Sequence, residues 1–192
     1  MNVQLIDKKE IIILATLTLI HQNGFHGTAM SMIAKQADVS IGTIYHYFPS
    51  KDVLIKEIHH YSRYKLFNYI FHDNEPKEQY RERFIFIFNR FITFFLENTA
   101  LFSFMEQYYS SPYYESSGLG SQVNLKEDDK IYDFLMEGIR SEQLKSINIH
   151  TLNALCFGTL ASFVKHILYR KLEYSEASIK EVIDIVWTGI KK

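Results

Sequence analysis

The chain has little of what would mark several common classes of protein. It contains one cysteine, Cys156, among its 192 residues, which excludes an internal disulfide framework and a zinc cluster built from cysteines. Its net charge of −1 provides no overall cationic field. The apolar run at 11–20 is too short to span a bilayer and has no secretory cleavage pattern. We therefore expect no membrane association and a reducing, cytoplasmic location.

Proline is also scarce, occurring only at positions 49, 76 and 112, and alternating strand patterns flanked by Asn-Gly or Asp-Gly turns are absent. Long proline-free segments with apolar residues spaced about 3.6 apart predict helices. A loop rich in Ser, Gly and Tyr is expected at 110–124. The fold class is therefore all-α, with helices expected at 8–23, about 29–37, 41–47, 51–71, 78–97, 99–110, 124–143, 149–172 and 175–190.

The first 48 residues contain three short helical segments, with a four-residue break between the second and third. This is the pattern of a helix-turn-helix, whose third helix enters the major groove of DNA. Thr28 and Ser40 are expected to cap the second and third helices, and Met32 to point inward with Ile33 and Ala37. The stretch TIYHYF at 43–48 supplies hydroxyl and imidazole groups suited to phosphate oxygens and base edges.

The stretch GFHGTAMSMIAKQADVSIGTIYHYFPSKDVL at 24–54 resembles the N-terminal DNA-binding domain of the TetR/AcrR family of transcriptional regulators. The similarity covers roughly residues 8–60. Ala37-Asp38 replaces the Ala-Gly usual in the turn, and Asp also tolerates a left-handed backbone. The matching positions are Gly24-Phe25, Thr28, Ile33-Ala34, the run from Val39 to Phe48, and the run from Ser50 to Leu54.

The resemblance implies a helix-turn-helix domain over 1–50, a connecting helix over 51–72, and a ligand-binding and dimerisation domain over 73–192. Ile41, Gly42 and His46 would face bases. The DNA-facing set is completed by Thr28, Ser40, Thr43, Tyr45, Tyr47 and Lys51, of which all but Ser40 would contact phosphates. The core of the unit is expected to contain Ile33, Ala34, Ile44, Phe48 and Leu54.

Charge differs slightly between the two parts of the chain. Residues 1–72 hold seven Lys and Arg against five Asp and Glu. Because this excess is small, we expect binding to double-stranded DNA to depend on two copies of the domain and on salt-sensitive phosphate contacts.

Two apolar patterns characterise the second domain, and each has two interpretations. Aromatic residues gather between Tyr80 and Tyr114 and either line an effector pocket or form a packed core. Apolar stripes in the last two helices serve either a homodimer or the core of one chain. The pocket candidates are Phe88, Phe91, Phe95, Phe104, Glu106, Gln107 and Tyr108. The dimer candidates are Leu155, Thr159, Phe163, Ile167, Ile179, Val182, Ile183, Val186, Trp187 and Ile190.

The sequence therefore favours a regulator, by resemblance a repressor, that a small apolar effector releases from a palindromic operator. The alternative is a helix-turn-helix protein that acts through protein partners without an effector. We expect no enzyme, since Cys156 lies in an apolar helix and no glycine-rich phosphate loop is present. We also expect no cofactor or metal: His59 and His60 are adjacent, and adjacent helical side chains diverge by about 100°.

Overall fold

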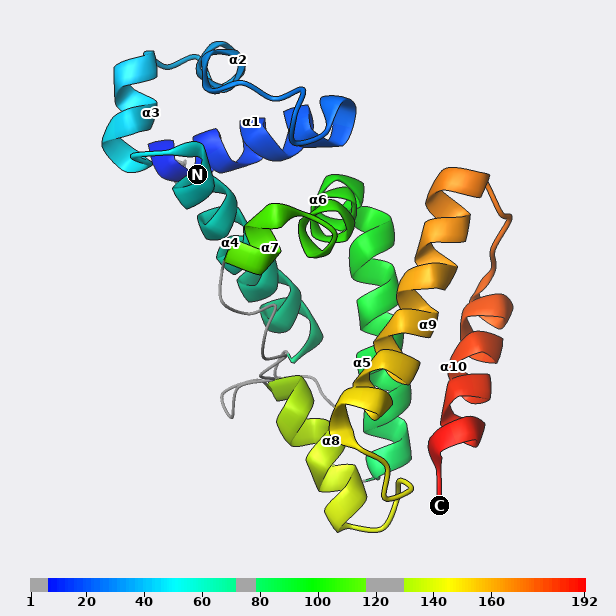
Figure 1. Cartoon of the computed structure of the whole chain (residues 1–192). Coiled ribbons are helices and arrows are strands. Elements are labelled where there is room, and N and C mark those ends of the chain that lie inside the picture. The colour runs from blue at the N-terminus through cyan, green and yellow to red at the C-terminus, as the bar shows by residue number, and fades with distance from the viewer. Residues whose placement is uncertain (1–6, 72–78, 117–129) are drawn as a thin grey trace, which may run out of the picture. The chain divides into compact units, whose positions relative to one another are not determined.

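Figure 1 shows a computed structural model of the chain, which describes residues 7–71, 79–116 and 130–192. Within these ranges the backbone is helical, apart from connections and one isolated bridge between Leu144 and Lys191. The all-α prediction is confirmed. The helices of the described ranges are α1 (Lys8–Asn23), α2 (Met30–Gln36), α3 (Ile41–Tyr47), α4 (Lys51–Ile70), α5 (Tyr80–Glu97), α6 (Thr99–Tyr109), α7 (Pro112–Ser116), α8 (Lys130–Arg140), α9 (Ile149–Arg170) and α10 (Glu176–Ile190).

Three expectations about local structure need correction. Thr28 does not cap α2: the N-cap is Ala29, without a side-chain hydrogen bond, and the Thr28 hydroxyl donates instead to the Gly24 carbonyl at 2.8 Å. Met32 does not point inward, because 39% of it is exposed. The segment 110–124 is not wholly a loop, since α7 occupies Pro112–Ser116. Residues 117–124 of that segment, and the predicted helical residues 124–129, lie outside the described residues.

The contacts divide the chain into two compact units. The first contains α1, α2, α3, the part of α4 up to Tyr64, α6 and α7, and the second contains the rest of α4, α5, α8, α9 and α10. In the first unit, α1 packs against both α2 and α6. The sequence-based boundaries at 50 and 72 stay a prediction, although residues 99–116 pack with the first unit.

The second unit is a helical layer with an aromatic interior. Helices α9 and α10 lie side by side in opposite directions, and both pack on α5 (Figure 1). Trp187 of α10 lies 5.1 Å from Phe84 of α5, measured between ring centroids. Tyr80 stacks on Phe134 of α8 at 4.7 Å and donates to its carbonyl at 3.0 Å. Burial of these rings removes large apolar areas from water and stabilises the unit.

Candidate nucleic-acid interface

The turn between α2 and α3 has the backbone that the sequence predicts. Asp38 adopts the left-handed conformation, with φ of 52°, and the Val39 amide donates to the Ala34 carbonyl at 3.0 Å. The residues expected in the core beneath the turn are buried, which confirms that interpretation: Ile33, Ala34, Ile44, Phe48 and Leu54. Helices α2 and α3 therefore pack on one buried apolar core.

Ser40 caps the N-terminus of α3. Its Oγ accepts a hydrogen bond from the Thr43 amide at 3.0 Å and lies 2.9 Å from the Thr43 hydroxyl. This confirms Ser40 as a helix cap, which satisfies one of the free amides at the helix start. The Thr43 hydroxyl remains partly exposed beside it.

One face of α3 is exposed and carries the residues expected to meet DNA. The exposed fractions of the large side chains are 43% for Ile41, 49% for Tyr45 and 36% for Tyr47. His46 is exposed as well, and its ring lies 5.3 Å from that of Tyr47. A Cβ added at Gly42 would have only ordinary contact with its own chain, with Ser40 Oγ at 3.7 Å. The chain's own packing therefore does not demand glycine there, whereas close approach of a ligand backbone would.

Thr28 and Lys51, which the resemblance assigns to phosphates, lie elsewhere. Thr28 has no exposed surface. The Lys51 ammonium donates a hydrogen bond to the backbone carbonyl of Phe25. Burial lowers the pKa of Lys51, and the charge of Asp52 partly opposes this shift. Both side chains thus contact the connection between α1 and α2.

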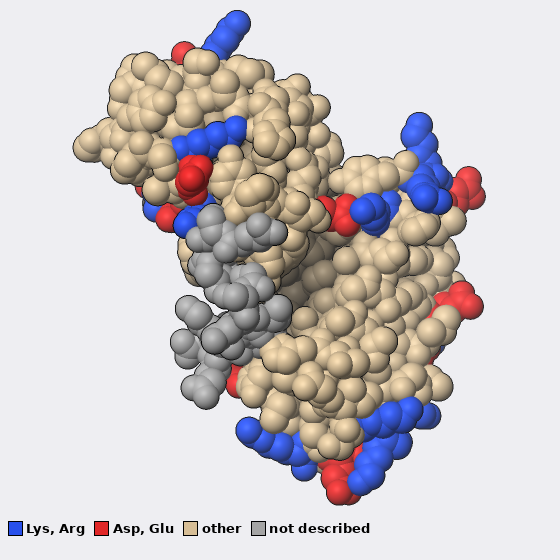
Figure 2. Space-filling view, in the orientation of Figure 1, with Lys and Arg blue, Asp and Glu red and all other residues tan. Residues whose placement is uncertain are grey.

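Charged side chains are sparse on the face drawn in the space-filling view. On the face drawn in Figure 2, Lys and Arg lie singly or in small groups, interspersed with Asp and Glu. This agrees with the small positive excess of residues 1–72 and provides little non-specific attraction for a polyanion.

The seven pocket candidates divide between the two units. On α5, Phe88 and Phe91 are buried and each lies 5.1 Å from Phe157 of α9. Buried Phe95 lies 4.9 Å from Phe91. The other four belong to α6 in the first unit: Phe104 and Tyr108 are buried, and Glu106 and Gln107 are half-buried.

Most of the dimer candidates are covered by the chain itself. Six are buried: Ile167, Ile179, Ile183, Val186, Trp187 and Ile190. Val182 and Phe163 are half-buried, while Thr159 is exposed and Leu155 is 48% exposed. The core of one chain therefore accounts for the α10 stripe without a second copy.

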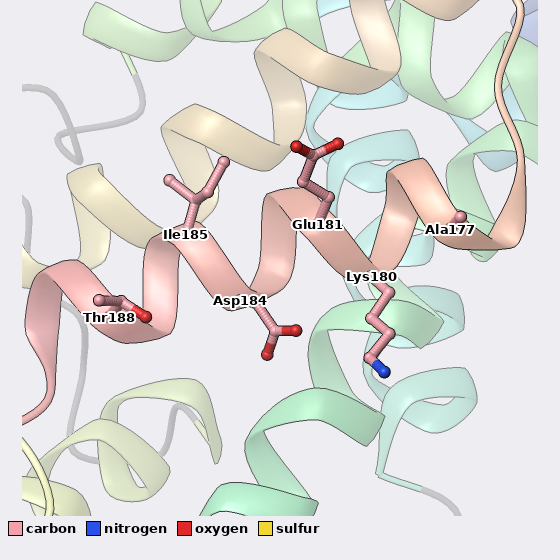
Figure 3. A pocket seen from close by; sticks show the side chains of 6 residues that line it. All are labelled: Ala177, Lys180, Glu181, Asp184, Ile185 and Thr188. Carbon is pink, nitrogen blue, oxygen red and sulfur yellow. The ribbon is translucent and has the colours of Figure 1, made fainter.

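The opposite faces of α9 and α10 are open. Ile185 is 63% exposed and borders an open groove of about 580 Å³ along α10, whose lining side chains Figure 3 shows: Ala177, Lys180, Glu181, Asp184, Ile185 and Thr188. A Cβ added at Gly158 of α9 or at Gly189 of α10 would meet no atom of the described chain within 4 Å. By length and composition α9 could also cross a membrane, and only 28% of its apolar window is buried.

Two sets of buried contacts that the sequence did not predict lie in the first unit. His59 of α4 stacks on Tyr108 at 4.3 Å, whereas neighbouring His60 is exposed. Phe25 packs against Phe104 and Tyr113. The helical period of α4 places residue 59 on the same face as Ile55 and Ile58, and this spacing could have predicted that His59 is buried. No spacing in the sequence could have predicted the contact of Tyr113 with Phe25.

Within the described ranges, no group of three or more His, Cys, Asp or Glu residues is placed to hold a metal ion. The single thiol, Cys156, is buried, and burial raises its pKa to about 12. It is therefore protonated at neutral pH and is a poor nucleophile.

Comparison with known families agrees with this architecture. Residues 12–58 match the family of bacterial regulatory proteins of the tetR type, and residues 77–191 match the tetracycline-repressor-like C-terminal domain. The chain belongs to the TetR family of transcriptional regulators.

Two curated relatives from Bacillus subtilis show different extents of similarity. The chain is 26% identical over 186 residues to the fatty acid metabolism regulator protein, covering 93% of each chain. It is 30% identical over 113 residues to the uncharacterised regulator YuxN, which covers 57% of this chain but only 38% of YuxN.

Solved structures show the same fold. A putative TetR-family regulator from Shewanella superposes with a TM-score of 0.85 at 22% identity, covering 97% of this chain and 99% of the other. The regulator FadR from Bacillus subtilis, solved with stearoyl-CoA, superposes with a TM-score of 0.77 at 22% identity, covering 94% and 98%.

Proposed function

We propose that this regulator binds a palindromic operator as a homodimer in the cytoplasm and represses transcription until a small apolar effector releases it. The observation that carries the proposal is the exposed face of α3, presented on a packed and capped helix-turn-helix. Within that face, Ile41 would contact a thymine methyl and His46 a base-edge acceptor. Thr43, Tyr45 and Tyr47 would donate hydroxyl groups to phosphates.

A homodimer is supported by the open faces of α9 and α10. A Cβ at Gly158 or Gly189 would meet nothing within 4 Å in the described parts of the chain, so a second helix can approach the backbone closely there. Exposed Leu155 and Ile185 supply apolar area beside them. A two-fold dimer would place two copies of α3 on successive major grooves, which is why the operator should be palindromic.

For the effector we propose a long-chain fatty acyl thioester, whose hydrocarbon chain is the apolar part that the protein would bind. The support is the full-length similarity to a fatty acid metabolism regulator and the stearoyl-CoA bound to the structurally similar FadR. Helix α5 contributes an apolar, phenylalanine-rich face suited to a hydrocarbon chain. Such a ligand would shift operator affinity only if it binds one dimer geometry more tightly than the other.

The test is selection of binding sites from random duplex DNA with the purified full chain. An enriched palindrome would support the proposal. Enrichment of no sequence, with only salt-sensitive general binding, would contradict operator recognition.

Stearoyl-CoA is then titrated onto the operator complex, with free coenzyme A and stearate as controls. Loss of operator affinity with stearoyl-CoA alone supports the effector. Unchanged affinity would contradict it and favour a regulator that works through protein partners.

A further inference from the structure

The connection between α1 and α2, residues 24–28, is held from the side by α6 and α7. The Phe25 ring is 6% exposed, and it lies 5.6 Å from the Phe104 ring and 5.3 Å from the Tyr113 ring. The Gln107 side chain donates to the Ile20 carbonyl in the last turn of α1, at 3.4 Å. We call residues 24–28 the α1–α2 corner.

The same corner is tied to the start of α4. The Lys51 ammonium donates to the Phe25 carbonyl, so the backbone and the ring of one residue are held by different helices. Gly24, with φ of 70°, closes the end of α1, and its carbonyl accepts from Thr28. A Cβ at Gly24 would come within 3.3 Å of Gln107 Oε1, a distance at which a neighbour must shift.

The corner leads directly into α2 and hence into the turn before α3. Its attachment therefore adds to the buried core of Ile33, Ile44 and Phe48 as a contact that positions α2 and α3. Helices α6 and α7 lie within the residues matched by the C-terminal family domain, 77–191, yet they pack in the same compact unit as the helix-turn-helix. The corner is thus a place where sequence of the C-terminal domain contacts the DNA-binding domain.

We propose that Phe25 and Lys51 are positioning residues for DNA recognition, which clamp the α1–α2 corner between α4 and α6–α7 and so fix the orientation of α2 and α3. The effect on DNA rests on the proposed function. The proposal assigns the Lys51 ammonium to a carbonyl of its own chain rather than to a phosphate. Loss of this donor would leave the half-buried Phe25 carbonyl with only the long hydrogen bond from the Thr28 amide, at 3.4 Å, and loosen the corner.

The experiment compares Lys51→Met and Phe25→Leu with wild type, using the full chain. Lys51→Met keeps the aliphatic stem and removes the charge, and Phe25→Leu keeps an apolar side chain without the ring contacts. Lys191→Met, a change at the exposed C-terminal end of α10, is the control for loss of one positive charge. Two quantities are measured: hydrogen exchange of amides in 20–36 and 99–109, and the slope of log K against log salt for DNA binding.

If the corner is a clamp, both variants exchange about tenfold faster than wild type in 20–36, because opening no longer breaks a charge-assisted hydrogen bond or a ring contact. Operator affinity falls by a similar factor, while the salt slope of Lys51→Met equals that of the control.

Unchanged exchange in Lys51→Met, with a slope whose magnitude falls by about 1.8, would identify one phosphate contact in each protomer of the dimer and overturn the proposal. If wild type selects no operator, the proposed function fails, but the exchange result still decides whether the clamp exists.

Discussion

His59 provides a quantitative test of the packing in the first unit. The side chain is 4% exposed and stacks on Tyr108, with 16° between the ring planes. Its Nε2 has no hydrogen-bond partner in the described parts of the chain. Burial, followed by the charges of Arg63 and His60, lowers the pKa of His59 from 6.5 to about 4.

The sign of the effect follows from this shift. Between pH 6.5 and about 4 the unfolded chain binds a proton at His59 that the folded chain does not bind. The free energy of unfolding therefore falls as the pH falls through this window, and the loss is complete near pH 4. At 1.36 kcal/mol per pKa unit the full loss is about 3 kcal/mol, and roughly 2 kcal/mol is already lost at about pH 4.5.

The assay is urea unfolding of wild type, His59→Phe and His60→Phe at about pH 7 and about pH 4.5. His59→Phe should be at least as stable as wild type at neutral pH, because an apolar ring replaces an unpartnered buried nitrogen. Between the two pH values it should lose roughly 2 kcal/mol less than wild type. His60→Phe, a change at the exposed neighbour, removes only the smallest of the three causes of the His59 shift and should lose nearly as much stability as wild type. Equal losses for all three chains would refute the reasoning.

Four further substitutions test other parts of the molecule. Gly158→Leu should leave the fold of one chain intact, since a Cβ there meets nothing within 4 Å among the described residues; sedimentation should show dimers becoming monomers. Gly138→Ala should lower the free energy of unfolding by about 1–3 kcal/mol in urea, because the new methyl group overlaps the Tyr80 ring and lies 2.7 Å from Leu144 Cδ1. His46→Ala should relax base preference at one operator position, whereas Tyr47→Phe should weaken binding to all sequences alike; identical site-selection profiles for the two variants would contradict these separate roles.

Much of the fold could be predicted because local signals and packing agree. Ser40 and Gly24 mark helix ends through chemistry that acts within a few residues, and both hold in the structure. Met32 shows the limit of such signals. In a helix of seven residues the apolar period is too short to fix a face, and the side chain lies at the surface.

The sequence motif predicted the exposed face of α3. It did not predict the contacts that hold the α1–α2 corner. Ile41, Tyr45 and Tyr47 are exposed because α3 buries only Ile44 beneath them. The partner of Lys51 is a backbone carbonyl 26 residues earlier in the chain. No residue type identifies such an acceptor, since every residue carries one.

The apolar stripes show the same limit at the scale of whole helices. A period of 3.6 shows that one face of a helix is covered, but it does not reveal what covers it. The stripe from Ile179 to Ile190 is covered by helices of its own unit, and α6 packs on α1 although its sequence belongs to the C-terminal domain. The surface proposed for a second copy consequently rests on positions that the unit leaves open: Ile185 and Gly189 on α10, with Leu155 and Gly158 on α9. Only the three-dimensional packing separates these open glycines from Gly138, where the space for a side chain is already filled.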